Sequence, residues 1–296
     1  MGIHAGLASI ILQEHAAKSF GSKVVTIGRQ TVILSQQEAM DLATASGVNV
    51  RLRHYRKPTV DDETRAAKAS SKDYITDKEF FTFMGVRNVE VLDVSKYEGA
   101  SVVCDLSKPQ PQLEGTTDVL IDGSSLDNIF DPATALRNLA GMLKPGGRLI
   151  SNNVGSNHSC PYVIPTPLWF FDYFVVNKFS RCDVYVVVRS IEGTNVLRID
   201  PLTMTHGKDS SWTPNIESQH TTHIIVIAER GLKSTHDKNP IQHQYRSEKV
   251  YKAYMRQLEV VSGNAGPNLI RSTVELFTHV PPGYEYIAPG IEDVQA

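Results

Sequence analysis

Three apolar runs in the first half of the chain end in residues that could hold a polar ligand. Residues 23–28 end at Gly28, residues 89–93 at Asp93 and residues 102–105 at Asp105. A carboxylate at such a place can accept hydrogen bonds from both hydroxyls of a ribose, or from an adenine amino group. A glycine lets a ligand lie close to the backbone. Each residue taken singly is also explained as a turn residue, but their shared position after predicted strands favours one site.

Three later segments could contribute catalytic or substrate-binding residues. Asp122-Gly123-Ser124-Ser125 follows the apolar run 119–121, and its side chains either order a substrate or cap the next helix. Asn152-Asn153 and Asn157-His158 follow the run 148–151. His158 is the best-placed general base, because imidazole titrates near neutral pH; Asp122 is a weaker candidate. The aromatic segment 162–179 then either packs on the sheet as a helix or lines an apolar pocket.

Strands and helices must alternate to position these residues. We expect a helix over 7–19, and helices opened by capping boxes at Ser35 and Thr76 and ended near Gly47 and Gly85. The unit 117–154 predicts a strand, an amphipathic helix up to Lys144-Pro145-Gly146-Gly147, and a second strand. Strong strands at 183–188 and 223–228 suggest an antiparallel edge hairpin. The expected fold is a doubly wound, mostly parallel α/β sheet, Rossmann-like, with an antiparallel closing strand pair.

The chain divides into two expected parts. Residues 1–235 form the α/β domain, with a polar and basic insertion at about 48–75 that is partly helical over 63–69. Residues 236–296 form a C-terminal extension, helical over 239–260 and Pro- and Gly-rich beyond.

Composition excludes several kinds of protein. A formal net charge of −2 and a pI of about 6.6 offer no basic field for nucleic acid or an anionic membrane. The three cysteines show no disulfide framework, and neither they nor the histidines show metal-ligand spacing, so no metal is predicted. No signal peptide, myristoylation pattern or membrane-spanning run is recognised, which makes the cytoplasm the expected location.

Several motifs together resemble the class I S-adenosylmethionine (SAM) methyltransferases over about residues 20–230. They are LDVS (92–95), TDVLIDGSSLDNIF (117–130), ALRNLAGMLKPGGRLI (135–150) and the closing strand pair. More narrowly, VVTIGRQ, FFTFMGV and NHSCPYVIPTPLWFFDYF resemble a divergent bacterial subgroup found near natural-product or surface-sugar genes. That subgroup carries Gly-Arg-Gln where the family has a glycine-rich loop.

The resemblance implies a site. It implies SAM held by residues at four strand ends: Gly28, Arg29, Asp93, Asp105, Asp122, Gly123 and Ser124. The substrate would lie over Ser124–Asn128 and His158, with Tyr162 and Trp169 beside it. Two features depart from the pattern. Asp127-Asn128 stands where the subgroup has Glu-His, and the link from Asp93 to Val102 is shorter than a usual crossover.

Four functions are weighed. The first is SAM-dependent methylation of a small-molecule O or N nucleophile, in secondary or sugar metabolism. The second keeps the fold but performs lyase, cyclase or isomerase chemistry, and the third is a non-catalytic partner of another subunit. A nicotinamide dehydrogenase is the fourth; the antiparallel closing pair and the Leu-Lys-Pro-Gly-Gly stop argue against it. The expected partner is a small molecule, and homodimerisation stays open.

Overall fold

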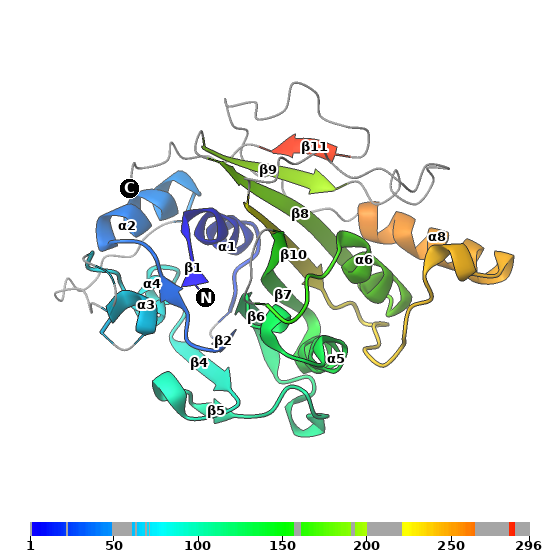
Figure 1. Cartoon of the computed structure of the whole chain (residues 1–296), viewed down its shortest axis with the longest axis horizontal. Helices are drawn as coiled ribbons and strands as arrows, with labels where there is room; N and C mark the ends of the chain where they lie inside the picture. Colours follow the sequence, from blue (N-terminus) through cyan, green and yellow to red (C-terminus); the bar gives the residue numbers. More distant parts are fainter. Residues whose placement is uncertain are drawn as a thin grey trace.

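The computed structural model is built on one large sheet (Figure 1). The structure describes residues 2–21, 23–48, 61–62, 64–68, 70, 72–156, 161–190, 193–199, 221–263 and 284–287. Nine strands lie in the order β11-β9-β8-β10-β7-β6-β2-β4-β5, and a separate two-stranded sheet pairs β1 with β3. The pairs from β5 to β7 are parallel, whereas β10 runs antiparallel to both β7 and β8. The expected fold class, a mostly parallel doubly wound sheet with antiparallel closing strands, is confirmed.

The first part of the chain follows the predicted pattern closely. Its elements are β1 (Gly2–Ile3), α1 (Ala5–Ala17), β2 (Lys23–Ile27), β3 (Thr31–Val32), α2 (Gln36–Ala45), α3 (Arg65–Lys68) and α4 (Asp77–Phe83). The Ser35 capping box is complete, since its hydroxyl accepts the Glu38 N–H and the Glu38 carboxylate accepts the Ser35 N–H. At α4 only the hydroxyl half of the predicted capping box is seen: the Thr76 hydroxyl accepts the Glu79 N–H.

The middle of the chain departs from expectation in three places. Its elements are β4 (Asn88–Asp93), η1 (Tyr97–Gly99), β5 (Val102–Val103), η2 (Pro111–Leu113), β6 (Thr117–Gly123), η3 (Leu126–Asn128), α5 (Pro132–Met142) and β7 (Leu143–Ser156). The third predicted strand is only two residues long, and the short link from Asp93 to Val102 holds the turn η1 in place of a crossover helix. The predicted helix begins at Pro132, after the short turn η3. The next strand already begins at Leu143, so Lys144-Pro145-Gly146-Gly147 lies inside β7.

The closing strands are more elaborate than an edge hairpin. The last elements are α6 (Pro167–Val176), β8 (Arg181–Ser190), β9 (Gly193–Ile199), β10 (Thr221–Glu229), η4 (His243–Tyr245), α8 (Glu248–Gly263) and β11 (Tyr284–Ile287). The hairpin is formed by β8 and β9, and β10 inserts between β7 and β8. The predicted antiparallel pairing of 183–188 with 223–228 is confirmed in β8 and β10, but the pair does not lie at the sheet edge, because β9 and β11 extend the sheet beyond β8.

Alternation along the strands divides the core into two layers. On β6, Leu120 packs into the layer formed with α5, α6 and α8, whereas Val119 and Ile121 pack into the layer formed with α1, α2 and α4. Figure 1 shows α5, α6 and α8 gathered apart from α1, α2 and α4. Helices on both faces explain why the central strands are almost continuously apolar.

Some predictions fall outside the described residues, among them the basic run 51–57 and most of the loop between β9 and β10. Of the predicted 63–69 helix, Arg65–Lys68 is present. Among described residues, none of the helices is both long and apolar enough to cross a membrane. Within the same residues, no three or more His, Cys, Asp or Glu side chains gather as metal ligands would.

Candidate functional site

The candidate site lies where the chain reverses its direction of travel across the sheet. From β2 the chain moves outward to β4 and β5, then crosses back to β6 and β7 on the other side of β2. The carboxyl ends of β2, β4 and β6 therefore meet at a switch in strand order, which is where open α/β sheets bind ligands. The predicted residues Gly28, Asp93 and Gly123 stand at these three strand ends.

Gly28 and Asp93 face each other across this edge. Gly28 has a φ of +69°, a left-handed backbone that favours glycine, and its N–H donates to the Leu92 carbonyl at 2.7 Å. A side-chain carbon placed on Gly28 would meet Asp93 Oδ2 and Ser125 Oγ, each at 3.7 Å. The other carboxylate oxygen of Asp93 accepts the Ser95 N–H at 3.2 Å. One oxygen of Asp93 thus fixes its own turn while the other faces the space over Gly28.

After β2, where the family has a glycine-rich loop, side chains form hydrogen bonds with the backbone. The Gln30 amide nitrogen donates to the carbonyls of Ile27 and Gly28 at 2.7 and 3.2 Å, and the Ser125 hydroxyl also donates to Ile27 at 2.8 Å. Asp77, at the start of α4, accepts the Gln30 N–H at 3.3 Å. The free carbonyls at the end of β2 are therefore satisfied by side chains.

Arg29 points into the protein. Its guanidinium lies 3.2 Å from Asp77 Oδ1, and both side chains are almost fully buried. Burial raises the pKa of Asp77, although the charge of Arg29 opposes the rise. This placement disagrees with the expected direct contact between Arg29 and a cofactor; Arg29 instead ties the loop to α4.

Gln30 also fills the space over Gly123. A Cβ on Gly123 would lie 1.9 Å from Gln30 Oε1, so a larger residue at the end of β6 would force the Gln30 side chain to move. Gln30 is fully buried, and among the described residues its Oε1 has no hydrogen-bond partner. Gln30 was missed as a site residue, although the Gly-Arg-Gln sequence after a strand was a signal.

Asp105 is held within its own turn. Its carboxylate accepts the Ser107 N–H at 3.0 Å and the Ser107 hydroxyl at 2.5 Å, and it pairs with Lys108 at 2.9 Å. These hydrogen bonds lower the pKa of Asp105 to about 2, with the Ser107 hydroxyl as the largest cause. Asp105 is therefore an ionised acceptor beside β5, whose carboxylate already has three hydrogen-bonding partners.

Asp122 is buried rather than available for catalysis. Its side chain is fully enclosed, with Oδ1 accepting the Ser125 N–H and Oδ2 the Ser151 hydroxyl, both at 2.7 Å. Burial, aided by the nearby charge of Asp127, raises its pKa to about 6. A role as proton acceptor or cofactor ligand disagrees with this geometry, because no face of the carboxyl reaches the surface.

Asp127 organises the turn after β6. One carboxylate oxygen accepts the Ser124 hydroxyl and the Val154 N–H, both at 2.7 Å, and the other accepts the Asn128 amide at 2.9 Å. Ser124 has a φ of +80°, an unusual backbone conformation for a serine, and its hydroxyl donates its hydrogen bond to Asp127. Ser124 and Asn128 thus stabilise the loop, and Asp127 connects η3 with β7.

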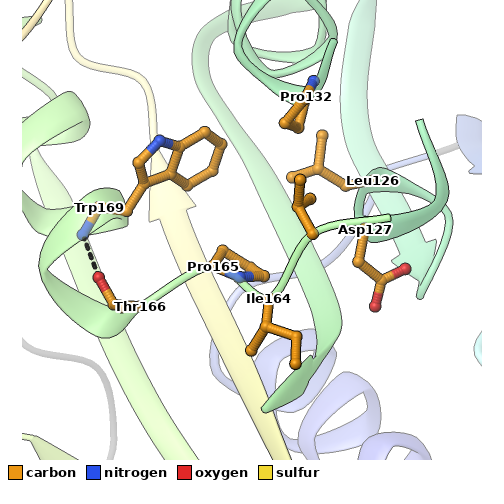
Figure 2. A pocket seen from close by; sticks show the side chains of 8 residues that line it. Leu126, Asp127, Pro132, Ile164, Pro165, Thr166 and Trp169 are labelled. Carbon is orange, nitrogen blue, oxygen red and sulfur yellow. Dashed lines mark hydrogen bonds between the residues drawn. The ribbon is translucent and has the colours of Figure 1, made fainter. Parts of the chain in front are cut away.

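An apolar pocket of about 220 Å³ lies beside this turn (Figure 2). Its walls come from η3, the start of α5 and the segment leading into α6: Leu126, Asp127, Pro132, Val163, Ile164, Pro165, Thr166 and Trp169. The Thr166 hydroxyl accepts the Trp169 N–H at 3.3 Å and begins α6. Of the predicted substrate residues, Asp127 and Trp169 line the pocket, while Tyr162 lies next to it and is 70% exposed.

Other predicted residues fall elsewhere. His158 and Asn157 lie outside the described residues. Asn152 and Asn153 lie within β7 and are buried, because this strand extends to Ser156. Most of the aromatic segment packs in the core, as one of its two interpretations held. The pocket residues Pro132, Ile164 and Pro165 were missed; the proline-rich entry into α6 was the available signal.

Comparison with known proteins gives only distant similarity. No protein-family model and no curated protein sequence matches the chain. A didemethyltoxoflavin N-methyltransferase from Burkholderia thailandensis, solved with S-adenosylhomocysteine, is 14% identical over 76% of this chain and 78% of that one, with a TM-score of 0.36. Geranyl diphosphate methyltransferase in complex with SAM is 14% identical over 76% and 85%, with a TM-score of 0.37. The cyclase SpnF is 11% identical over 76% and 81%, with a TM-score of 0.35.

These TM-scores are low, so the fold assignment rests on the protein's own strands. The strands β5, β4, β2, β6 and β7 are parallel, and β10 inserts antiparallel between β7 and β8, so that β8 again runs in the direction of β7. This strand order is that of a Rossmann-like, doubly wound α/β fold, as the sequence predicted.

Proposed function

We propose that the protein is a SAM-dependent methyltransferase that modifies an oxygen or nitrogen of a small molecule. The observation that carries the proposal is the carboxylate of Asp93 facing Gly28 at the switch in strand order. A carboxylate there suits the two ribose hydroxyls of a nucleoside, and the left-handed Gly28 leaves the backbone open to it. The apolar pocket beside Asp127 supplies a second compartment close to the same edge.

The residues of this edge would hold the cofactor and place the acceptor. Asp93 and Gly28 would hold the ribose, and Asp105 would accept from the adenine amino group. When bound, SAM supplies a methyl group on a positively charged sulfur. The residues around the pocket would hold the acceptor with its oxygen or nitrogen facing that methyl group, and the acceptor's proton would pass to solvent or to a base. Because the sulfonium is already reactive, positioning provides most of the rate.

Calorimetric titration with S-adenosylhomocysteine tests this proposal. We expect binding in the micromolar range, weakened about tenfold or more by Asp93→Asn, because hydrogen bonds to a charged acceptor are stronger than neutral ones. Asp118→Asn is the matched control, since Asp118 begins β6 at the opposite edge and pairs with exposed Lys144. Absence of both binding heat and a thermal shift would exclude the proposal.

The second candidate keeps the fold but performs another reaction. It is favoured by Gln30, whose side chain fills the space over Gly123 at the switch in strand order. Such a protein would use the apolar pocket for cyclase, lyase or isomerase chemistry. Mass spectrometry of an acceptor incubated with SAM separates the two, because methyl transfer adds one methylene unit to the mass of the acceptor, whereas isomerisation adds nothing.

A further inference from the structure

The walls of the pocket have a distinct chemical character. Five of its eight lining residues are aliphatic or proline, one is Trp169, and the two polar ones are Asp127 and Thr166. The Asp127 carboxylate points away from the indole (Figure 2) and already accepts three hydrogen bonds. None of these eight residues is cationic. An anionic acceptor would therefore lose its hydration without gaining a charge partner, which is strongly unfavourable.

The shape of the pocket favours a flat ring. Figure 2 shows the Trp169 indole facing Leu126 and Pro132 across the pocket, with Pro165 between them at one side. The indole is held edge-on by the fully buried Phe170, with ring centroids 4.9 Å apart at 82°. Proline walls are rigid because the ring fixes φ. The pocket is thus preformed around a planar aromatic face.

The size of the pocket bounds the ring system. A cavity of about 150 Å³ accepts benzene, and pockets for drug-sized ligands begin at about 300 Å³. The 220 Å³ observed here lies between these limits and fits one or two fused rings.

An exposed aromatic pair extends the apolar surface beyond the pocket. Phe130 and Tyr162 are 85% and 70% exposed, and their rings meet edge to face at 5.9 Å. Phe130 lies two residues before the lining residue Pro132, and Tyr162 directly precedes the lining residue Val163. The Asp127 carbonyl accepts the N–H groups of both Tyr162 and Val163, at 3.0 and 3.2 Å, which fixes the pair beside the pocket.

We propose that the acceptor is an uncharged planar aromatic compound that carries a hydroxyl or amino group. Its ring lies against Trp169 between the proline walls, and any further apolar part rests on Phe130 and Tyr162. The inference rests on the proposed function in naming the compound an acceptor, but binding of the ring itself requires no cofactor.

The test measures binding of two matched probes, 2-naphthol and 2-naphthoate, to the whole chain by calorimetry at pH 7. They share a ring system and differ in charge. We expect 2-naphthol to bind at least about tenfold more tightly than 2-naphthoate, because the pocket has no cation to pair with the carboxylate. Equal or tighter binding of 2-naphthoate, or no binding of 2-naphthol, would overturn the inference.

Variants locate the bound ring. Trp169→Leu is expected to weaken 2-naphthol binding about tenfold, and Tyr162→Ala about threefold, through loss of aromatic contact. Because Tyr162 is exposed, its variant should fold even if the Trp169 variant does not. The control is Tyr245→Ala, which removes an equally exposed tyrosine from η4. Unchanged binding in the Tyr162 variant together with unchanged binding in a folded Trp169 variant would also overturn the inference.

The two titrations distinguish failure of the methyltransferase proposal from failure of the aromatic-acceptor proposal. If S-adenosylhomocysteine binds and 2-naphthol does not, the acceptor class is wrong while the methyltransferase proposal stands. If 2-naphthol binds and S-adenosylhomocysteine does not, the pocket is an aromatic site in a protein with another activity.

Discussion

At the scale of single residues, Asp122 shows how a strand end can look catalytic and be structural. The carboxyl follows β6 at the edge where ligands bind, yet it is enclosed and does not reach the surface. Its hydrogen bonds from Ser125 and Ser151 join the turn after β6 to β7. Burial of an acid in this way has a thermodynamic consequence, because the folded protein binds the proton more tightly than the unfolded chain does.

Asp122 predicts a pH dependence of stability. Its pKa is about 6 in the folded protein, against an ordinary value of 3.8, and this difference corresponds to about 3 kcal/mol. Below pH 4 both states hold the proton and no stability is lost. As the pH rises from 4 to 6 the unfolded chain ionises first, so the free energy of unfolding falls and then stays lower. In Asp122→Asn this fall is absent, because the amide does not titrate.

Urea unfolding of both proteins at pH 4 and pH 7.5 measures the effect. The asparagine introduced by Asp122→Asn can accept the Ser125 N–H and donate to Ser151, whose hydroxyl rotates to accept. We expect the variant to gain about 2–3 kcal/mol relative to the natural chain between the two pH values. Titrating groups that do not interact with Asp122 cancel in this comparison. An equal difference at both pH values would mean that Asp122 is not the responsible acid.

At the scale of elements, the turn between β2 and β3 is held by side-chain contacts of Gln30. The Gln30 side chain packs directly against Gly123, and a Cβ on Gly123 would lie 1.9 Å from the Gln30 amide oxygen. We expect Gly123→Ala to lower the free energy of unfolding by about 2–3 kcal/mol through this clash. In a background with Gln30→Ala, the same change should cost much less, because the obstructing side chain is gone.

A double-mutant cycle on Gln30 and Gly123 measures this coupling by urea unfolding. An interaction energy of about 2 kcal/mol is expected, within the range found for residues in direct contact. Gly263→Ala is the control, since a Cβ on Gly263 meets nothing within 4 Å. Additive effects of the two changes would show that the side chain of Gln30 does not occupy the space over Gly123.

Local signals predicted most elements, and distant contacts decided the rest. Ser35 and Thr76 begin helices as their capping patterns indicated, because a cap acts within one turn. The start of β7 at Leu143 was not predictable in this way. The Arg230 guanidinium donates to the carbonyls of Gly141 and Leu143, both at 2.7 Å, and so satisfies the end of α5 from a distant part of the chain. No local pattern at Lys144-Pro145-Gly146-Gly147 reveals that partner.

The same distinction applies to the candidate site. Gly28 and Asp93 were predicted because strand ends can be read from apolar runs, and parallel strands bring those ends together. The buried pairing of Arg29 with Asp77, which joins two segments far apart in the sequence, could not be read from either segment alone. Nor could the pocket walls, which combine residues from η3, α5 and the approach to α6.

At the scale of the whole molecule, a buried ionic network joins the first helix to the closing strands. Glu14 on α1 accepts hydrogen bonds from Arg148 of β7 and from Arg181 of β8, at 2.7–3.1 Å. Asp183 extends the network by accepting from Arg181 at 2.6 Å and from Arg198 of β9 at 2.8 Å. Glu14 is 1% exposed. Two carboxylates, Glu14 and Asp183, therefore balance three arginines at the place where α1 covers β7 and β8.

Neutralising Glu14 should destabilise the whole fold, because it leaves its two arginine partners with too little compensating charge in a buried place. We expect Glu14→Gln to lower the free energy of unfolding by about 3–5 kcal/mol, the usual effect of removing one partner from a buried ion pair. Glu229→Gln is the matched control: it breaks the Lys18–Glu229 pair, which is partly exposed, and should cost less than about 1 kcal/mol. Raising the salt concentration should reduce the smaller effect and leave the larger one nearly unchanged, since buried pairs are weakly screened. Urea unfolding at low and high salt measures both, and equal losses in the two variants would show that α1 is held by its apolar contacts alone.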